Sequence, residues 1–480
     1  MGDLADAMKA YAAGGLYPMH MPGHKRDVRF GLGEPMALDL TEVDGVDDLY
    51  AAGGILAEGM ARAATLYGSR AALYLVGGST AGVLAGVLAA APAGSAVAIA
   101  RNSHRSAYAA LELGRLSPVY LLPAQDMSFG VAGSIAPADV AAALDRRPDI
   151  KLVLITSPTY DGVVSDVAAI ARVAHGRGVP LMVDAAHGAH LGFSAAFPES
   201  AVAAGADLAV MSLHKTLPAL TQCALLHVSG ALVDEDEVRR RLSMVQTSSP
   251  SYPLMASIDQ CVGWMAREGA EAMAAHGARL DRFSAAAADL KRLRVMRMGR
   301  DAAAAHPGVF GFDRSKLVIS TRGTDLTGPA LAAALREQHA IETEMALGDY
   351  VLALTGPCDS DEGMARLEGA LLAIDRAARP GKQMPPAPTM AMPVQAMPVQ
   401  AMPIADAMAA AREETPLSAA AGRVAAEYAW AYPPGVPLIA PGERVGGDFV
   451  AAAAAMAAAG VALRRTSGGR AGCLRVVARQ

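Results

Sequence analysis

The chain is poor in cysteine, has no strong excess of charge of one sign and contains no long hydrophobic run. A net charge of -5 over 480 residues argues against the broad basic surface that nucleic-acid binding uses. Apolar stretches are broken by Gly, Pro or charge before they reach the roughly 20 residues of a membrane-spanning helix. The four cysteines form no CxxC pair, which argues against a disulfide framework and against a zinc site. They are Cys223, Cys261, Cys358 and Cys473.

The N-terminal stretch MGDLADAMKAYAAGG carries acidic residues and lacks the basic segment and apolar core of a signal peptide. We therefore expect a cytoplasmic protein. Hydrophobic residues make up 52% of the chain and charged residues 19%, a balance that indicates a folded protein and not a disordered one. At roughly 100–200 residues per domain, this length suggests two to four domains.

Short apolar runs alternate with helical stretches between residues 65 and 230. Each run is apolar throughout and ends in Gly, Ser, Asn, Pro or Asp, as is typical of strands covered on both faces. Helices are expected between them, at 80–91, 137–145 and 166–176. This alternation predicts an α/β fold with a mainly parallel sheet and helices on both sides. The predicted strands are 71–76, 96–100, 118–123, 151–156, 180–184, 208–212 and 224–228.

Beyond residue 255 the helical stretches become longer. One long helix or two are predicted over 255–295, and a smaller α/β unit follows. That unit is expected to contain strands at 316–321 and 349–356 and helices at 328–338 and 360–378.

Residues 380–404 are rich in Met and Pro and contain the pentad MPVQA twice in tandem. Because proline at every fifth position blocks both helix and sheet, we expect an extended linker there. Helices are expected after it near 416–429 and 447–459. The predicted units are an N-terminal segment (1–60), a large domain (61–295), a small α/β domain (296–379), the linker (380–404) and a C-terminal domain (405–480).

The stretch LYLVGGSTAG, at 73–82, is a predicted strand that runs through Gly77, Gly78, Ser79 and Thr80 into a helix. Glycines let the backbone turn sharply and approach a ligand, and the amides at a helix N-terminus favour a phosphate. The stretch is neither a P-loop nor a GxGxxG motif. A purely structural turn remains the alternative for this segment.

Two further apolar strands run into residues with reactive side chains. Asp184 ends the strand in PLMVDAAHGAH, where a carboxylate is costly unless a cation or a hydrogen-bond donor meets it. Lys215 follows the strand in LAVMSLHKTLPALTQ, and a lowered pKa there would make its neutral amine a nucleophile. Taken singly, Asp184 could cap a turn and Lys215 could be a surface lysine.

Together, these three parts match what pyridoxal 5'-phosphate requires. Its aldehyde needs a lysine, its pyridine nitrogen needs an acid, and its phosphate needs a helix N-terminus and hydroxyl groups. Asp184 precedes Lys215 by 31 residues, which leaves room for one helical crossover between neighbouring strands. The residues therefore favour a cofactor site at one edge of the predicted sheet.

The sequence also resembles the Orn/Lys/Arg decarboxylase family, in its shorter bacterial form. The resemblance implies a fold-type-I pyridoxal-phosphate-dependent enzyme with an aspartate-aminotransferase-like large domain and smaller C-terminal α/β and terminal domains. It covers nearly the whole chain apart from the linker. The matching stretches are PMHMPGHKR (18–26), DLTEVDGVDDL (39–49), LVGGSTAGVLAGVLAA (75–90), RNSHRSAY (101–108), SPTYDGVVSDV (157–167), VDAAHGAHLGF (183–193), SLHKTLPALTQ (212–222), QTSSPSYPLMASID (246–259) and TPLSAAAGRVAAEYAWAYPPGVPLIAPGE (415–443).

The resemblance implies catalytic roles for four side chains. Lys215 would be the Schiff-base lysine, and Asp184 would pair with the pyridinium nitrogen. His104 would stack on one face of the cofactor ring, opposite Ala186, and His187 would lie near the 3'-oxygen.

The resemblance also implies a set of phosphate contacts. The residues implied to contact the phosphate bound in their own subunit are Ser79, Thr80, Ala81, Ser212 and His214. Thr247 and Ser248 resemble a segment that reaches the phosphate of a neighbouring subunit, so the resemblance implies a homodimer or a higher homo-oligomer.

The implied activity is decarboxylation of arginine, lysine or ornithine to a polyamine-type amine. An acid should then bind the distal cation of this small-molecule substrate, and the candidates are Glu42, Asp44, Asp47, Asp48 and Glu344. Arg322 could instead bind an α-carboxylate, as an aminotransferase requires. The alternatives are therefore another pyridoxal-phosphate reaction on the same fold, such as aminotransfer, aldol cleavage or elimination, and a non-catalytic relative.

Overall fold

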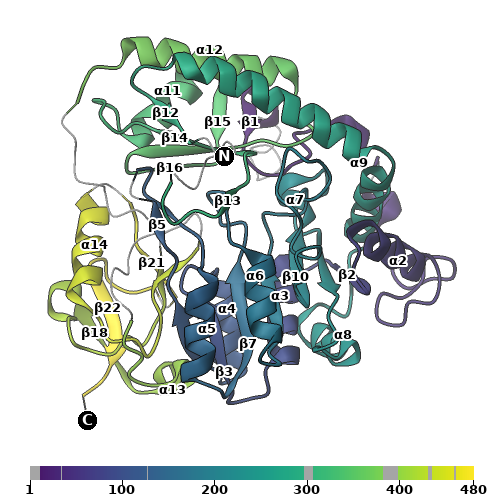
Figure 1. Ribbon diagram of the computed structural model, residues 1–480, viewed down its shortest axis with the longest axis vertical. Helices are drawn as coiled ribbons and strands as arrows, with labels where there is room; N and C mark the ends of the chain where they lie inside the picture. Colours follow the sequence, from purple (N-terminus) through teal and green to yellow (C-terminus); the bar gives the residue numbers. More distant parts are fainter. Residues whose placement is uncertain are drawn as a thin grey trace.

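The computed structural model describes residues 11–33, 35–126, 128–296, 306–381, 398–430, 435–458, 461–466 and 468–479. Its centre is a seven-stranded sheet in the order β2-β11-β10-β9-β7-β3-β4 (Figure 1). Only β11 in this sheet is antiparallel to its neighbours. The strands are β2 (Ala71–Leu75), β3 (Ala96–Ala100), β4 (Ser117–Leu121), β7 (Ile150–Thr156), β9 (Leu181–Asp184), β10 (Leu208–Ser212) and β11 (Ala224–Val228). The predicted fold class is confirmed, and every predicted strand of this sheet is present.

Helices cover both faces of the sheet. α3 (Gly78–Ala90) and α4 (Arg105–Leu113) carry the chain toward β4, whereas α5 (Pro137–Arg146) and α6 (Val167–His175) carry it back. Because such crossovers are right-handed, the two pairs of helices lie on opposite faces. The apolar strands between them are therefore buried on both sides, as their composition predicts.

Two glycines let α3 pack closely on the sheet. A Cβ atom on Gly82 would lie 2.6 Å from Leu75 Cδ1, and one on Gly86 would lie 2.7 Å from Met182 Cε. Larger residues would push the helix away from the strands. This close packing holds the N-terminus of α3 near the carboxyl ends of the parallel strands, where ligands bind in open α/β sheets.

A smaller unit lies above the central sheet in Figure 1. One long helix, α9 (Tyr252–Ala286), precedes it, within the region predicted as one helix or two. The N-terminal strand β1 (Tyr17–Met19) pairs in parallel with β15 (Ile341–Thr343), so the first loop of the chain joins this unit. Its four-stranded sheet contains β12 (Arg294–Val295), β14 (Lys316–Ser320), β17 (Tyr350–Leu354) and β16 (Met345–Leu347), with helices α11 (Gly328–His339) and α12 (Asp361–Ala377).

The C-terminal unit lies beside the central sheet in Figure 1 and contains short strands with two helices. Most of the predicted linker falls on residues 382–397, which lie outside the described residues. The unit's elements are α13 (Ile404–Ala409), β18 (Arg412–Pro416), β19 (Ala429–Trp430), β20 (Pro437–Ile439), α14 (Gly447–Ala458), β21 (Arg464–Arg465) and β22 (Cys473–Val477). The predicted helix at 447–459 is confirmed by α14.

The predicted helix at 416–429 is wrong. Only a short 3-10 turn forms there, over Leu417–Ala419. Gly422 has a left-handed φ of 81°, and its N–H donates to the carbonyl of Val445. The N–H groups of Ala425 and Ala426 donate to Glu443 and Arg475. Tertiary backbone pairing therefore overrides the helix propensity of this alanine-rich stretch.

Arg101 joins the C-terminal unit to the central sheet. Its guanidinium lies 3.1 Å from the carboxylate of Glu443 and donates to the carbonyls of Pro437 and Leu438. Both partners of this ion pair are buried, so the pair anchors the segment that follows β19. Among the described residues, no helix is both long and apolar enough to cross a bilayer.

Candidate active site

A cavity of about 500 Å³ opens at the carboxyl edge of the central sheet. Nine of the twelve predicted site residues line it. They are Ser79, Thr80, His104, Asp184, Ala186, His187, Ser212, His214 and Lys215. These nine side chains are up to 136 positions apart in the sequence, from Ser79 to Lys215.

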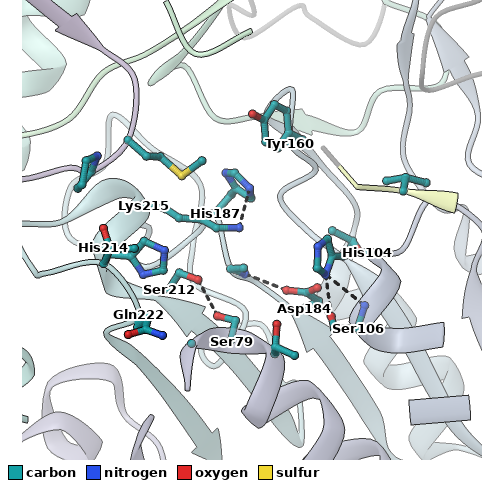
Figure 2. Close-up of a pocket in the computed structure, with 18 of the residues that line it drawn as sticks. Ser79, His104, Ser106, Tyr160, Asp184, His187, Ser212, His214, Lys215 and Gln222 are labelled. Carbon is teal, nitrogen blue, oxygen red and sulfur yellow. Dashed lines mark hydrogen bonds between the residues drawn. The ribbon is translucent and has the colours of Figure 1, made fainter. Parts of the chain in front are cut away.

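The N-terminus of α3 forms the floor of the cavity. Gly78 has a φ of 68°, which favours glycine, and its N–H donates to the carbonyl of Gln222 at 3.1 Å. The hydroxyls of Ser79 and Ser212 lie 2.6 Å apart (Figure 2). Free amides at a helix N-terminus and two neighbouring hydroxyls are suited to bind an anion such as a phosphate.

Asp184 ends β9 with its carboxylate on the cavity wall. It is 5% exposed, and its Oδ1 accepts a 3.2 Å hydrogen bond from the N–H of Ala186. Burial raises the pKa of Asp184, and the charge of Lys215 opposes that shift. Thr156, its register partner in β7, has a buried Oγ1 without a hydrogen-bond partner among the described residues. These polar groups can therefore accept a polar ligand.

Lys215 lies in the short helix α7 (Leu213–Thr216), directly after β10. Its Nζ is 3.0 Å from Nε2 of His187 (Figure 2). Burial lowers the pKa of Lys215, while the Asp184 charge opposes this shift. Burial and the Lys215 charge hold the pKa of His187 well below its ordinary value, so the ring is neutral and Nε2 accepts from the lysine. The amine is thus poised to react as a nucleophile.

Two further histidines are held in the neutral form. His104 caps the N-terminus of α4, and its Nδ1 accepts from the N–H of Ser106 at 3.2 Å. Burial lowers its pKa to about 3, with a smaller effect from the Lys215 charge. His214 donates from Nδ1 to the carbonyl of Cys223 at 3.0 Å, and burial lowers its pKa to about 4. Neutral rings of this kind can pack against a planar ligand without adding charge.

Three separate segments of the chain also line the cavity. Tyr160 follows β7, Glu344 follows β15, and Met21 follows β1. The Tyr160 hydroxyl donates to Glu344 Oε1 at 2.5 Å, and the Met21 N–H donates to Oε2 at 3.0 Å. The Tyr160 ring also packs edge-on against His187, with ring centroids 5.0 Å apart. These contacts connect Glu344 to the neighbourhood of Lys215.

Three predicted site residues do not line the cavity. Ala81 lies in the first turn of α3, but its side chain packs in the core. Thr247 and Ser248 lie in an exposed loop between α8 (Glu235–Val245) and α9. Their predicted contact with a neighbouring subunit stays a prediction.

Of the five candidate acids, Glu344 is the one that lines the cavity. Asp47 instead accepts hydrogen bonds from the N–H groups of Gly53, Gly54 and Leu56 near the start of α2 (Ile55–Tyr67). Glu42, Asp44 and Asp48 also lie outside the cavity lining.

Arg322, the candidate for an α-carboxylate, pairs with Asp349 in the small unit and lies outside the cavity lining. The observation that would have favoured an aminotransferase is therefore missing from the described site.

Several lining residues were not predicted from the sequence. Met21, Tyr160 and Ser106 stand in stretches that carry the family resemblance, but no role was assigned to them. The remaining lining residues without a predicted role include Pro22, Asn102, Thr156, Thr221, Gln222 and Val436. Sequence spacing did not mark these residues, because loops from different units bring them to one cavity.

The sheet, and the lysine and aspartate at its carboxyl edge, define a fold-type-I enzyme. The solved structure of the Escherichia coli constitutive lysine decarboxylase shares the fold, with a TM-score of 0.76, 19% identity, and coverage of 94% of this chain and 77% of that one. A structure of SPT with PLP is also similar, with a TM-score of 0.56, 16% identity, and coverage of 75% and 87% of the two chains. At these identities the likeness concerns the fold.

Sequence comparison then identifies the family. Residues 3–296 match the Orn/Lys/Arg decarboxylase major domain, and residues 386–459 match its C-terminal domain. An arginine decarboxylase of Bacillus subtilis is 32% identical over 461 residues, which cover 92% of this chain and 90% of that protein. The chain belongs to the Orn/Lys/Arg decarboxylase family and is an amino-acid decarboxylase.

Proposed function

We propose that this protein decarboxylates arginine, lysine or ornithine, with pyridoxal phosphate as cofactor, and releases a polyamine-type amine and carbon dioxide. One observation carries the proposal: a single cavity is lined by Lys215, by the buried carboxylate of Asp184 and by the carboxylate of Glu344. The names of the relatives, which act on arginine and lysine, support the same substrate class.

The residues of the cavity fit pyridoxal phosphate. Asp184 is a buried carboxylate with room for a cationic partner, and the Nδ1 of His187 is buried without a hydrogen-bond partner among the described residues. The N-terminus of α3, with Ser79 and Ser212, suits the phosphate. Bound there, the cofactor would supply an electron sink for the bond to the departing carboxylate.

Each side chain then has a defined task. Asp184 would hold a proton on the pyridine nitrogen, and its charge would stabilise electron density that develops during the reaction. Lys215, which donates to neutral His187, would attack as a free amine and later return a proton to the substrate. Ala186 and His104 would enclose the ring from its two faces and exclude water.

Glu344 would bind the distal cation of the substrate. Its two oxygens accept from the Tyr160 hydroxyl and the Met21 N–H, which are both neutral donors. A carboxylate has about four acceptor positions, so two remain for an ammonium or a guanidinium. Neither donor neutralises the carboxylate, so its charge would favour basic amino acids as substrates.

Product analysis tests this proposal. The purified protein, saturated with pyridoxal phosphate, is incubated separately with arginine, lysine and ornithine, while carbon dioxide and the matching amine are measured. We expect equal amounts of both products from at least one of the three. Formation of a keto acid without carbon dioxide would contradict the proposal and indicate aminotransfer.

We further propose that the active form is a homodimer in which Thr247 and Ser248 reach the partner's phosphate site. Two observations support this arrangement. The loop that carries both residues is exposed, and apolar side chains such as Val28, Met36 and Val43 are exposed in the N-terminal segment. Sedimentation equilibrium should give twice the chain mass, and a monomer with full activity would contradict it.

A further inference from the structure

Tyr160 contacts two groups that line the cavity. On one side its ring packs edge-on against His187, which accepts a hydrogen bond from Lys215. On the other side its hydroxyl donates to Glu344 at 2.5 Å. The residue therefore links the neighbourhood of the Lys215 amine to the carboxylate of Glu344.

The hydroxyl of Tyr160 restricts the carboxylate of Glu344. The last torsion of a glutamate side chain is broad, so a carboxylate held at one oxygen can rotate. Here Tyr160 holds Oε1 and the N–H of Met21 holds Oε2, which leaves one defined orientation. Both donors are neutral, so they orient the group without neutralising the charge that a cationic substrate needs.

A second tyrosine forms a comparable bridge nearby. Tyr350, in β17, donates from its hydroxyl to Oδ1 of Asp161 at 3.0 Å. Asp161 directly follows Tyr160, so both bridges join the loop after β7 to the small unit. Tyr350 and Asp161 are buried and lie outside the cavity lining, whereas Tyr160 and Glu344 line the cavity.

We propose that Tyr160 is a positioning residue that fixes the carboxylate of Glu344 and thereby selects substrates with a distal cation. The inference rests on the proposed function and extends it to a residue that does not itself carry charge. It requires that loss of the hydroxyl weakens binding of basic substrates and leaves the reaction at the α-carbon intact.

Steady-state kinetics of Tyr160→Phe test this inference. We expect KM for the preferred basic amino acid to rise about tenfold, the effect of losing one hydrogen bond to a charged group, with kcat changed less than about threefold. The kcat/KM for norleucine, which has no distal cation, should stay the same. Glu344→Gln should raise KM for the basic amino acid more than Tyr160→Phe does. The variant that carries both substitutions should have a KM no higher than that of Glu344→Gln alone.

Two further variants make the result decisive. Tyr350→Phe removes the same kind of bond from the same loop outside the cavity, so KM for the basic substrate should not change. Glu344→Asp keeps the charge but withdraws it from the Tyr160 hydroxyl, so it should reproduce the rise in KM even if Tyr160→Phe does not fold.

Three outcomes would overturn the inference. In the first, Tyr160→Phe lowers kcat by the same factor as kcat/KM. In the second, Tyr160→Phe lowers kcat/KM for norleucine as much as for the basic amino acid. In the third, the effects of Tyr160→Phe and Glu344→Gln on KM are additive in the double variant. In each case the wild-type protein still makes amine, and the proposed function stands. If the wild-type protein releases no carbon dioxide from any basic amino acid, the proposed function fails and this inference fails with it.

Discussion

Lys215 and Lys316 both extend into the protein interior, but their amines have different partners. Lys316 is 0% exposed, and its Nζ is 2.9 Å from Oδ2 of Asp313. Oδ1 of Asp313 meets His190 at 3.1 Å. Lys215 faces a cavity, and its hydrogen-bond partner is the neutral ring of His187. One amine is enclosed with a counter-charge, and the other opens onto space for a ligand.

The difference lies in what each amine can still bind. Burial alone would raise the pKa of Asp313, but His190 and Lys316 hold it well below its ordinary value. In that network the Lys316 ammonium and the Asp313 carboxylate pair with each other, and His190 joins β14 to the loop after β9. Around Lys215, burial lowers the pKa of the amine and leaves polar atoms nearby without partners. The two amines thus differ in whether a carboxylate lies within hydrogen-bonding distance, and not in burial itself.

The largest expected effect comes from Lys215→Ala. Because the amine would be both the cofactor ligand and a proton donor, decarboxylation should fall by at least about 10³-fold. The visible absorption band of lysine-bound cofactor should disappear. The stability of the cofactor-free protein to urea should change less than in a variant that breaks a direct ion pair, because Asp184 loses the charge of Lys215 but keeps its hydrogen bond from the Ala186 N–H. Retention of the visible band would show that another lysine holds the cofactor.

Lys316→Met should lower the stability of the protein and leave its activity nearly unchanged, the reverse of Lys215→Ala. It leaves the buried carboxylate of Asp313 without its ammonium partner, and such a change typically costs about 3–5 kcal/mol of unfolding free energy. Urea unfolding measures that loss, while kcat/KM per folded molecule should stay close to that of the wild-type protein. As a control, Asp313→Asn combined with Lys316→Met should recover part of the stability. A strong loss of kcat/KM in the folded fraction would show that Lys316 acts on the reaction.

Much of the fold and part of the site could be predicted from the sequence. The apolar runs predicted β3, β10 and β11 with the bounds that the structure shows, since strands buried on both faces leave a clear pattern. Asp184 and Lys215 were marked as candidates because they follow such strands.

Other features depend on contacts that spacing along the chain does not encode. Glu344 was only one of five candidate acids, and Tyr160 was not assigned a role. Their bridge forms between a loop of the large unit and a strand end of the small unit, 184 positions apart. The wrong helix at 416–429 has the same origin, because its backbone pairs with distant residues such as Val445.

The smallest expected effect concerns Asp161, a buried carboxyl group whose partner is neutral. Burial raises the pKa of Asp161 from 3.8 to about 6, and the hydrogen bond from Tyr350 opposes that shift. The folded state therefore binds the proton more tightly than the unfolded chain. Its contribution to stability is fully present below about pH 4 and is lost as the pH rises through about 6.

Two units of pKa correspond to about 3 kcal/mol, which is an upper bound for this contribution. Urea unfolding at pH 4, 5, 6 and 7 measures it, and Asp161→Asn should remove most of the decline across that range, because an amide does not titrate. Asp313, whose pKa is held well below its ordinary value, should give no such decline. If the wild-type protein and Asp161→Asn lose stability in parallel, the carboxylate of Asp161 is ionised at every pH tested. The hydrogen bond from the neutral Tyr350 hydroxyl then suffices to stabilise a buried charge.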